Sequence, residues 1–341
     1  MPINFFKFLE HNEYLDPRSG FDNVKIPVET RQDPITKEFS RIMPIKDYKL
    51  LETNVDEIVE RSKQFFCPFC PENLEKATPC FIKEVAPEGR IHFGNSVVIP
   101  NLFPYDLHNG VVIVTPDHFV PMDNFPPSVI SDSINAAFEY LRRIKKYDPE
   151  GSLFPSVNWN FMPASGGSIV HPHLHVLAGP TPSSKIENEI HATKEYYRLH
   201  GSNIWRDFVN KERFLDERYI GNTGKIHWMT SFASRSLYDI SVVFEGCKTV
   251  DDFDNELISV LSHALHKIFK FLADKNCPSF NMAIFFGGEQ LKNYWVHARI
   301  LSRFNLPPMG GSDINYLQML HDDHWTVYYP EDTASMLKEI F

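Results

Sequence analysis

The sequence of 341 residues has no apolar run that approaches the roughly 20 residues a membrane-spanning helix needs. No small-residue cleavage site follows its first residues, so no secretory signal peptide is predicted. It also lacks any block of Lys and Arg interleaved with aromatic residues, and its formal net charge is −10. A nucleic-acid groove is therefore not expected, although local groups could hold a small nucleotide. We expect a soluble cytoplasmic protein that binds neither membrane nor nucleic acid.

Cysteine is scarce, with five residues in the chain and only one close pair, Cys67 and Cys70. Without a secretory signal, this usage favours a metal site and spare thiols over disulfides. Apolar residues make up 43% and charged residues 23%, which excludes a disordered or fibrous class. The length allows two domains or one large duplicated domain with a sizeable core.

The most informative segment is residues 171–175, which read His-Pro-His-Leu-His. In an extended strand, side chains at alternate positions share one face, so three imidazoles project together. The loop at 160–168 precedes them, and Gly166 and Gly167 let backbone N–H groups approach an anion. A core strand whose histidines merely find hydrogen bonds is the alternative. The combination predicts a site that holds and attacks a phosphate.

Within this segment we expect His173 to be the nucleophile. A neutral imidazole attacks phosphorus well when its other nitrogen donates to a fixed acceptor, and a neighbouring backbone carbonyl is the expected partner. Asn160, Ser168 and the backbone of Gly166 and Gly167 are candidates to hold the phosphate oxygens. A plain loop with turn residues is the alternative for this group.

Cys67 and Cys70 are separated by two residues, a spacing at which a tight turn offers two thiolates to one metal ion. A tetrahedral zinc needs two more ligands, and His118 and His171 are the candidates. A redox pair is the main alternative, although the flanking prolines and the lack of an evident thioredoxin-type context argue against it. A closed site of four protein ligands would be structural and would fix the histidine strand rather than activate water.

The chain contains a pattern that occurs twice, after a polar N-terminal segment, 1–60, that we expect to wrap the body. The first copy lies in 61–200 and the second in 201–341, and chance recurrence is the alternative. Apolar residues at helical spacing predict one long helix in each copy, covering a face of an antiparallel sheet. The expected elements are strands at 91–93, 96–100, 110–115, 157–160 and 170–177 around a helix at 128–146, then strands at 226–228, 239–244, 280–286 and 294–301 around a helix at 254–275.

A set of separated motifs follows one order along the chain: 31–36 (RQDPIT), 67–73 (CPFCPEN), 100–104 (PNLFP), 115–118 (TPDH), and Asn160 with 166–168 (GGS) and 171–173 (HPH). Together these segments resemble the galactose-1-phosphate uridylyltransferase family of the histidine-triad superfamily. The resemblance implies an α+β class with a duplicated histidine-triad-like fold, in which two halves form a largely antiparallel sheet flanked by helices, as a homodimer. It also implies zinc (Zn²⁺) at Cys67, Cys70, His118 and His171.

The same resemblance implies a double displacement. His173 would take a nucleoside monophosphate from a nucleotide sugar or dinucleotide, and phosphate or a sugar phosphate would remove it as the phosphate-bearing acceptor. His173, His175, Ser168 and Asn160 are the expected catalytic residues. Substrate-binding roles are expected for Arg31, Asn101, Asn160, Gly166, Gly167, Ser168 and His175.

The chain departs from the family in ways that bear on the reaction. His175 replaces a Gln, and an imidazole there can contact phosphate or protonate a leaving group, which makes hydrolysis an option. In the family's second metal site Glu189 and His297 match, but Arg299 and Phe286 stand near the other positions, so we expect no second metal.

The C-terminal sugar-pocket segment, 318–325, reads Gln-Met-Leu where the family offers a carboxylate, so galactose 1-phosphate is not expected as a substrate. Three alternatives to a transferase remain. The chain would act as a phosphorylase of nucleotide sugars or dinucleoside polyphosphates, as a histidine-triad nucleotide hydrolase, or as a zinc-stabilised nucleotide-binding protein without turnover.

Overall fold

The computed structural model describes residues 2–45, 48–288, 290–306 and 308–341. The strands are β1 (Phe6–Asp16), β2 (Asp22–Gln32), β3 (Phe39–Ile42), β4 (Ile91–Phe93), β5 (Ser96–Pro100), β6 (His108–Ile113), β7 (Phe154–Phe161), β8 (His173–Gly179), β9 (Tyr219–Thr223), β10 (Ile226–Thr230), β11 (Asp239–Phe244), β12 (Ser279–Phe285), β13 (His297–Arg303), β14 (Asn305–Leu306), β15 (Gly311–Ser312) and β16 (His324–Thr326). The helices are α1 (Val55–Ser62), α2 (Pro71–Ala77), α3 (Pro127–Tyr147), α4 (Ser184–His200), α5 (Ile204–Leu215), α6 (Asn255–Asp274), α7 (Tyr316–Leu320) and α8 (Pro330–Lys338), with short 3₁₀ turns at η1 (Pro17–Ser19), η2 (Met122–Asn124), η3 (Glu150–Ser152), η4 (Pro163–Ser165) and η5 (Val250–Asp252).

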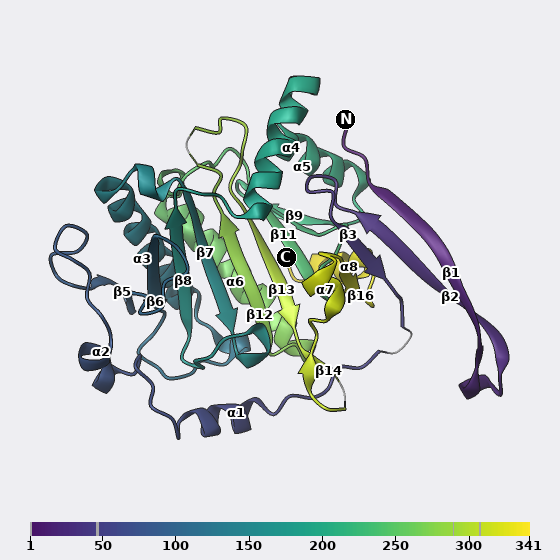
Figure 1. Cartoon of the computed structure of the whole chain (residues 1–341), viewed down its shortest axis with the longest axis horizontal. Helices are drawn as coiled ribbons and strands as arrows, with labels where there is room; N and C mark the ends of the chain where they lie inside the picture. Colours follow the sequence, from purple (N-terminus) through teal and green to yellow (C-terminus); the bar gives the residue numbers. More distant parts are fainter. Residues whose placement is uncertain (1, 46–47, 289, 307) are drawn as a thin grey trace.

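A ten-stranded antiparallel sheet forms the body, in the order β4-β5-β6-β8-β7-β12-β13-β11-β10-β9 (Figure 1). Read outward from the centre, β7-β8-β6-β5-β4 mirrors β12-β13-β11-β10-β9, and both sets follow the chain in the same order. The predicted duplication is confirmed by this topology. The halves share one sheet and one hydrophobic core, and the boundaries at residues 60 and 200 stay predictions.

The structure corrects how the two copies align. The first strands predicted for the two copies, 91–93 and 226–228, are not counterparts, because Ile226 opens β10, whose counterpart is β5 rather than β4. The counterpart of β4 is β9, a strand the sequence analysis did not predict. Tight turns at Gly94 (φ 54°) and Gly224 (φ 59°) join the paired strands in each half, and this left-handed backbone favours glycine. The similar sequences at 91–93 (IHF) and 226–228 (IHW) therefore do not occupy equivalent positions.

Helices α3 and α6 cover one face of the sheet, as predicted, and lie side by side behind it in Figure 1. Pro127 occupies the first turn of α3, where its missing N–H leaves no helical bond unmade. Between the helices and the central strands, Trp159, Phe269 and Phe280 pack together, the two phenylalanine rings stacking with centroids 4.5 Å apart. This apolar layer joins the two halves.

The opposite face of the sheet is covered differently in each half. Over the first half, Cys67 and Phe69 pack on Ile99, Val111 and Ile113. Over the second half, α4 and α5 form a separate apolar cluster with residues of β10, β11 and the segment before β13. The functional site described below lies on this face of the first half.

The N-terminal segment lies against the body only in part: Ile3 and Ile35 belong to the cluster around α4 and α5, and Val59 belongs to the main core. Strands β1 and β2 pair along their full length into a hairpin that extends away from the body at the right of Figure 1. Strand β1 is exposed from Phe6 to Leu15. The base of the hairpin joins β3, which pairs in parallel with β16 near the C-terminus.

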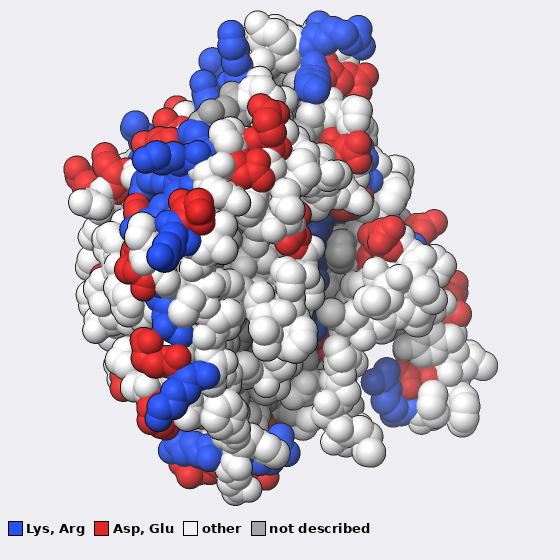
Figure 2. Space-filling model, turned by 60° about the vertical axis from the view of Figure 1, so that its left-hand side comes forward, with Lys and Arg blue, Asp and Glu red and all other residues white. Residues whose placement is uncertain are grey.

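The surface agrees with the composition. On the face seen in Figure 2, Lys and Arg intermingle with Asp and Glu and form no single basic area. Within the described part of the chain, no helix combines the length and apolar character that crossing a membrane requires.

Candidate active site and metal centre

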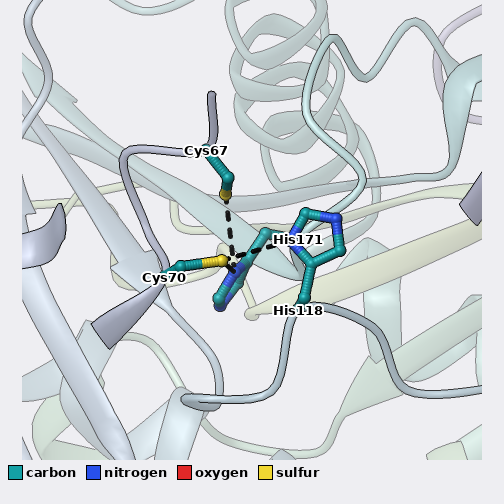
Figure 3. Close-up of side chains that lie close together, drawn as sticks. All are labelled: Cys67, Cys70, His118 and His171. Carbon is teal, nitrogen blue, oxygen red and sulfur yellow. Dashed lines mark hydrogen bonds between the residues drawn. The ribbon is translucent and has the colours of Figure 1, made fainter. Parts of the chain in front are cut away.

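The four predicted metal ligands converge (Figure 3). One ligand atom from each of Cys67, Cys70, His118 and His171 lies within 4.8 Å of the other three. His171 Nδ1 lies 3.7 Å from both sulfur atoms, and His118 Nδ1 lies 3.2 Å from Cys70 Sγ. A tetrahedron built with ordinary zinc–sulfur and zinc–nitrogen bonds has sulfur–nitrogen edges of roughly 3.6 Å. The group therefore fits a tetrahedral metal ion.

The surrounding hydrogen bonds orient the imidazoles for this role. His171 Nε2 donates to the carbonyl of Thr115 at 2.8 Å, which leaves the Nδ1 lone pair for a metal. His118 Nε2 lies 2.9 Å from Ser62 Oγ in the same arrangement. Burial and the adjacent Cys67 raise the pKa of Cys70 to about 12, so a pair of thiolates here needs a cation beside it.

Strand β8 places its histidines opposite the core. Leu174, Val176 and Ala178 point into the layer beneath α3 and α6, so His173 and His175 face the other side. The two rings are 5.2 Å apart. The strand begins at His173, three residues later than predicted, because Pro172 has no N–H to donate to a neighbouring strand. The carbonyl of Pro172 still accepts from Val114 N at 3.0 Å.

His173 has the geometry of a neutral nucleophile. Its Nδ1 lies 2.8 Å from the carbonyl oxygen of His171, and a carbonyl can only accept, so Nδ1 carries the proton. The predicted backbone acceptor is thereby confirmed. Burial lowers the pKa of His173 to about 4, which keeps the ring uncharged near neutral pH. Nε2 consequently retains its lone pair.

A cavity of about 540 Å³ lies against His173 and His175. It brings together most of the predicted site from three separate stretches of chain. The predicted residues in its lining are Asn101, Asn160, Gly166, Gly167, Ser168, His173 and His175.

The glycine loop is held in an unusual conformation. Met162 has φ 66° and ψ 160°, a region that side chains rarely adopt, and its carbonyl accepts from both the N–H and the hydroxyl of Ser165. Gly166 has φ 89°, and a Cβ on Gly167 would meet the carbonyl oxygen of Asn160 at 3.2 Å. Both positions therefore favour glycine where the backbone passes close to the cavity.

Aromatic residues at the mouth of the cavity were not predicted. Asn101 Nδ2 donates to Asn109 Oδ1, which also accepts from Tyr105 N, so the two amides shape the connecting loop. Tyr105 and Phe103 are largely exposed on that loop and line the cavity with Phe66. Exposed aromatic rings that line a cavity suit the stacking of a planar ring. The sequence signal was the aromatic pair around a proline at 103–105.

Arg31 does not reach the cavity. Its guanidinium is buried, pairs with Glu29 and Glu331, and lies over the ring of Phe232, 4.7 Å from its centroid. Its predicted role in substrate binding therefore has no geometric support within this chain.

The C-terminal segment expected to line a sugar pocket also lies elsewhere. Helix α7 contains Met319, which is exposed, and Gln318, which caps the helix through the backbone of Asn315. Trp325 packs against Phe304. None of these residues is part of the cavity lining.

The second half has a counterpart of the site, and it is filled. His297 begins β13 as His173 begins β8, and its Nδ1 likewise faces a carbonyl two residues earlier, at 3.3 Å. Trp205 stacks on the imidazole with ring centroids 4.3 Å apart, and Phe285 stacks at 5.2 Å. The cavity beside it is only about 40 Å³. No ligand the size of a nucleotide fits there.

Glu189 and His297, which match two positions of the family's second metal site, contact each other at 3.3 Å. Glu189 accepts from the hydroxyl of Tyr294 at 2.6 Å and contacts the ammonium of Lys185. Burial acts to raise the pKa of Glu189, but His297 and Lys185 together hold it below its usual range. Arg299 forms an ion pair with Asp239 close by. Two cationic side chains beside the carboxylate do not fit a metal ion.

Comparisons with known proteins agree with this architecture. No family model matches the chain. An uncharacterized protein of Archaeoglobus fulgidus is 26% identical over 315 residues, which is 92% of each sequence. Among solved structures, an ADP-glucose phosphorylase from Arabidopsis thaliana with bound ADP-glucose has a TM-score of 0.71 at 17% identity, and the match covers 92% of this chain and 99% of that one.

Two further structures show the same similarity. A GalT-like protein from Arabidopsis thaliana has a TM-score of 0.69 at 19% identity, covering 92% of this chain and 99% of that chain. A uridylyltransferase has a TM-score of 0.64 at 21% identity, covering 91% and 97%. The resemblance predicted from the sequence is therefore confirmed at the level of the fold.

Proposed function

We propose that this protein is an enzyme that transfers a nucleoside monophosphate from a nucleotide sugar to a phosphate-bearing acceptor through a covalent nucleotidyl-His173 intermediate. One observation carries the proposal: a buried, neutral imidazole donates through Nδ1 to a fixed carbonyl, which leaves Nε2 nucleophilic beside a cavity of about 540 Å³. The solved structures with this fold include a phosphorylase with ADP-glucose bound and a uridylyltransferase.

In the first step, the lone pair of His173 Nε2 attacks the α-phosphorus of the nucleotide sugar. A P–N bond forms, the bond from that phosphorus to the bridging oxygen breaks, and sugar 1-phosphate leaves with the electron pair. The positive charge that develops on the ring is stabilised by the Nδ1–H donated to the carbonyl of His171. In the second step, an oxygen of the acceptor phosphate attacks, the P–N bond breaks, and His173 regains its lone pair.

The glycine loop and the amide of Asn160 are placed to receive the charge of the transition state. Gly166, Gly167 and Ser168 line the same cavity as His173 and are at least partly exposed to it. Donors fixed before the reaction stabilise a phosphoryl transition state more than the ground state.

Phosphate is the acceptor that the lining favours, which would make the protein a phosphorylase. Among the described residues that line the cavity, none is a carboxylate that could bind sugar hydroxyls, and α7, where a sugar pocket was expected, does not line it. Hydrolysis is the second candidate, because His175 stands beside His173 with an Nδ1 that is buried and has no hydrogen-bond partner among the described residues.

We assign the Cys67, Cys70, His118 and His171 site to zinc, whose ligand preference is sulfur and nitrogen in a tetrahedron. When bound, zinc supplies a fixed cross-link and no open position for catalysis. His171 then ties the strand of the nucleophile to the cysteine turn, and its carbonyl stays in place to accept from His173. We also propose a cytoplasmic homodimer, which sedimentation of the purified protein would test.

The covalent intermediate is tested by trapping it. The protein is mixed with ADP-glucose or UDP-glucose labelled at the α-phosphate, denatured in base, and assayed for an acid-labile adduct. We expect label on the wild type and none on a His173→Asn variant. The control is His263→Gln, an exposed histidine of α6 outside the cavity, which should be labelled normally. Labelling of the His173 variant, or of neither protein, would contradict the proposal.

The acceptor is identified by chasing the labelled enzyme with inorganic phosphate, glucose 1-phosphate or buffer alone. Release of a labelled nucleoside diphosphate by phosphate selects the phosphorylase. Release of a nucleotide sugar by glucose 1-phosphate selects the transferase. Release of the labelled nucleoside monophosphate in buffer alone, as fast as in the presence of either acceptor, selects the hydrolase.

A further inference from the structure

The central seam of the sheet brings a second asparagine against the cavity. Asn281 on β12, in the second half, is the register partner of Asn160 on β7, in the first half. Asn160 lines the cavity and Asn281 does not. Asn281 Nδ2 lies 2.6 Å from Asn160 Oδ1, so the two amides are directly bonded across the seam.

The orientation of the Asn281 amide follows from its partners. Arg303 Nη1 lies 2.6 Å from one end of this amide, and a guanidinium can only donate, so that end is the oxygen. The carbonyl of Ser165 lies 2.9 Å from the other end, and a carbonyl can only accept, so that end is the NH₂ group. The same NH₂ group faces Asn160, whose nearest atom must then be its oxygen.

The amide of Asn160 is fixed in turn. Because its oxygen is used by Asn281, its own NH₂ group is directed away from the seam, and that nitrogen has no hydrogen-bond partner within the described residues. A donor without a protein partner, on a residue that lines the cavity of His173, is suited to an anion. If the Asn160 amide were turned the other way, its oxygen would face the cavity and would repel an anion.

Arg303, Asn281 and Asn160 form a series of hydrogen bonds that we call the relay. Asp313 anchors the relay in the C-terminal part of the chain. Asp313 accepts from Nε and Nη2 of Arg303 at 2.6–2.9 Å, and both side chains are buried. This bidentate pair leaves Nη1 of Arg303 directed at Asn281. Residues more than 100 positions from the glycine loop thus set the hydrogen-bonding polarity of the site.

We propose that Asn281, oriented by Arg303 and Asp313, is a positioning residue that holds the NH₂ group of Asn160 toward the cavity as a donor to the phosphoryl oxygens of the substrate. The inference deepens the function proposed above and rests on it. It assigns the second half of the molecule, whose own site is filled, a role in the reaction of the first half.

Asn281→Asp tests the inference, because a carboxylate still accepts from Arg303 but cannot donate to Asn160. The Asn160 amide would then turn its NH₂ group to Asp and its oxygen to the cavity. Binding of AMP and UMP is measured by calorimetry beside adenosine and uridine, which lack the phosphate. We expect the monophosphate that binds the wild type to lose about tenfold to a hundredfold in affinity, with the nucleoside unchanged.

A double-mutant cycle separates this role from simple charge repulsion or a structural effect. In an Asn160→Ala background, Asn281→Asp should cause no further loss of monophosphate affinity. Arg303→Lys, which still offers a donor to Asn281, should keep more affinity than Arg303→Leu, and thermal unfolding confirms that each variant is folded.

The outcomes distinguish this inference from the proposed function. If wild type binds a monophosphate and Asn281→Asp binds it equally, or if that substitution still weakens binding in the Asn160→Ala background, the relay is overturned and the function stands. If wild type binds neither monophosphate, both fail.

Discussion

At the scale of single residues, the chemistry of the site depends on one carbonyl. The sequence predicts His173 as the nucleophile and a backbone acceptor for its proton, and the structure confirms the acceptor as the carbonyl of His171. The partner of Asn160 could not be predicted, because Asn281 comes beside it only through strand pairing across 121 residues. Local pattern identifies a reactive group, whereas its orientation depends on long-range register.

The imidazole of His175 is the residue whose role most needs a test. Burial lowers the pKa of His175, so the ring is a neutral donor rather than a ready acid near neutral pH. Expulsion of a sugar phosphate needs no proton on the leaving oxygen. We therefore expect His175→Gln to form the His173 adduct within about tenfold of the wild-type rate, since an amide can replace one hydrogen bond.

His175→Phe is the matched control, because it keeps a ring beside Tyr105, whose centroid lies 6.0 Å from that of His175, but has no donor. In rapid-quench measurements, His175→Phe should form the His173 adduct more slowly than His175→Gln does. Complete loss of the adduct in His175→Gln would instead make His175 an essential acid.

His324 should make the stability of the folded protein depend on pH. Burial, with Arg235 and Arg299 nearby, lowers the pKa of His324 to about 3. Since an unfolded histidine titrates near 6.5, the unfolded state binds more protons between about pH 3 and 6.5, and stability falls as the pH falls through that window. The slope from this one group is at most about 1.4 kcal/mol per pH unit.

Urea unfolding at pH 7 and pH 5 measures this effect. The comparison is between wild type and His324→Gln, because the two proteins share every other ionisable group. The variant should lose less stability between the two pH values. Equal losses would show that His324 is not responsible.

At the scale of elements, the long amphipathic helices α3 and α6 were predicted closely because their apolar residues recur at helical spacing. Strand β9 was not predicted, since only Ile220 of its five residues is buried and its pattern is weak. Strand β8 begins at His173 rather than at the predicted residue 170, because Pro172 has no N–H to donate. Elements with one strongly apolar face are readable locally, whereas β9 has too few buried apolar positions to be read from the sequence.

The cysteine turn is the element whose removal should have the largest effect on the active half. Metal analysis of the purified protein should find about one zinc per chain, and Cys67→Ser should lower both the metal content and the melting temperature, because Cys67 also packs on Ile99 and Ile113. Cys80→Ser, at an exposed cysteine outside the metal group, is the control and should change neither. Normal metal content in the Cys67 variant would remove Cys67 from the ligand set.

At the scale of the whole molecule, duplication produced two similar halves with different fates. His173 and His297 occupy equivalent positions, but only His173 faces an open cavity, because Trp205 and Phe285 stack on the ring of His297. The sequence shows Arg299 two residues after His297, where the first copy has His175 two residues after His173. It does not show that the second half supplies Asn281 to the first, since that contact exists only in the joined sheet.

The two ends of the chain are held together by a buried charge cluster. Glu331 on α8 accepts from Arg31 at 2.8 Å and from Arg218 at 2.7 Å, and both guanidiniums are almost completely buried. Burial acts to raise the pKa of Glu331, but the hydrogen bond from Arg31 and the pairing with Arg218 hold it below the usual range. Arg31 was predicted from its motif to bind substrate, but it pairs with Glu29 and Glu331 and does not line the cavity, so we expect a structural role.

Removal of Glu331 should therefore destabilise the protein without changing its chemistry. Glu331→Leu leaves two buried guanidiniums short of a carboxylate, and we expect a loss of about 2–4 kcal/mol in the free energy of unfolding, measured in urea on the metal-loaded protein. Glu331→Gln keeps hydrogen bonds and should lose less. Glu339→Gln, an exposed site just beyond α8, should stay within about 0.5 kcal/mol of wild type. The His173 adduct should form normally in all three folded variants, and a slower adduct in the Glu331 variants would return Arg31 to the substrate site.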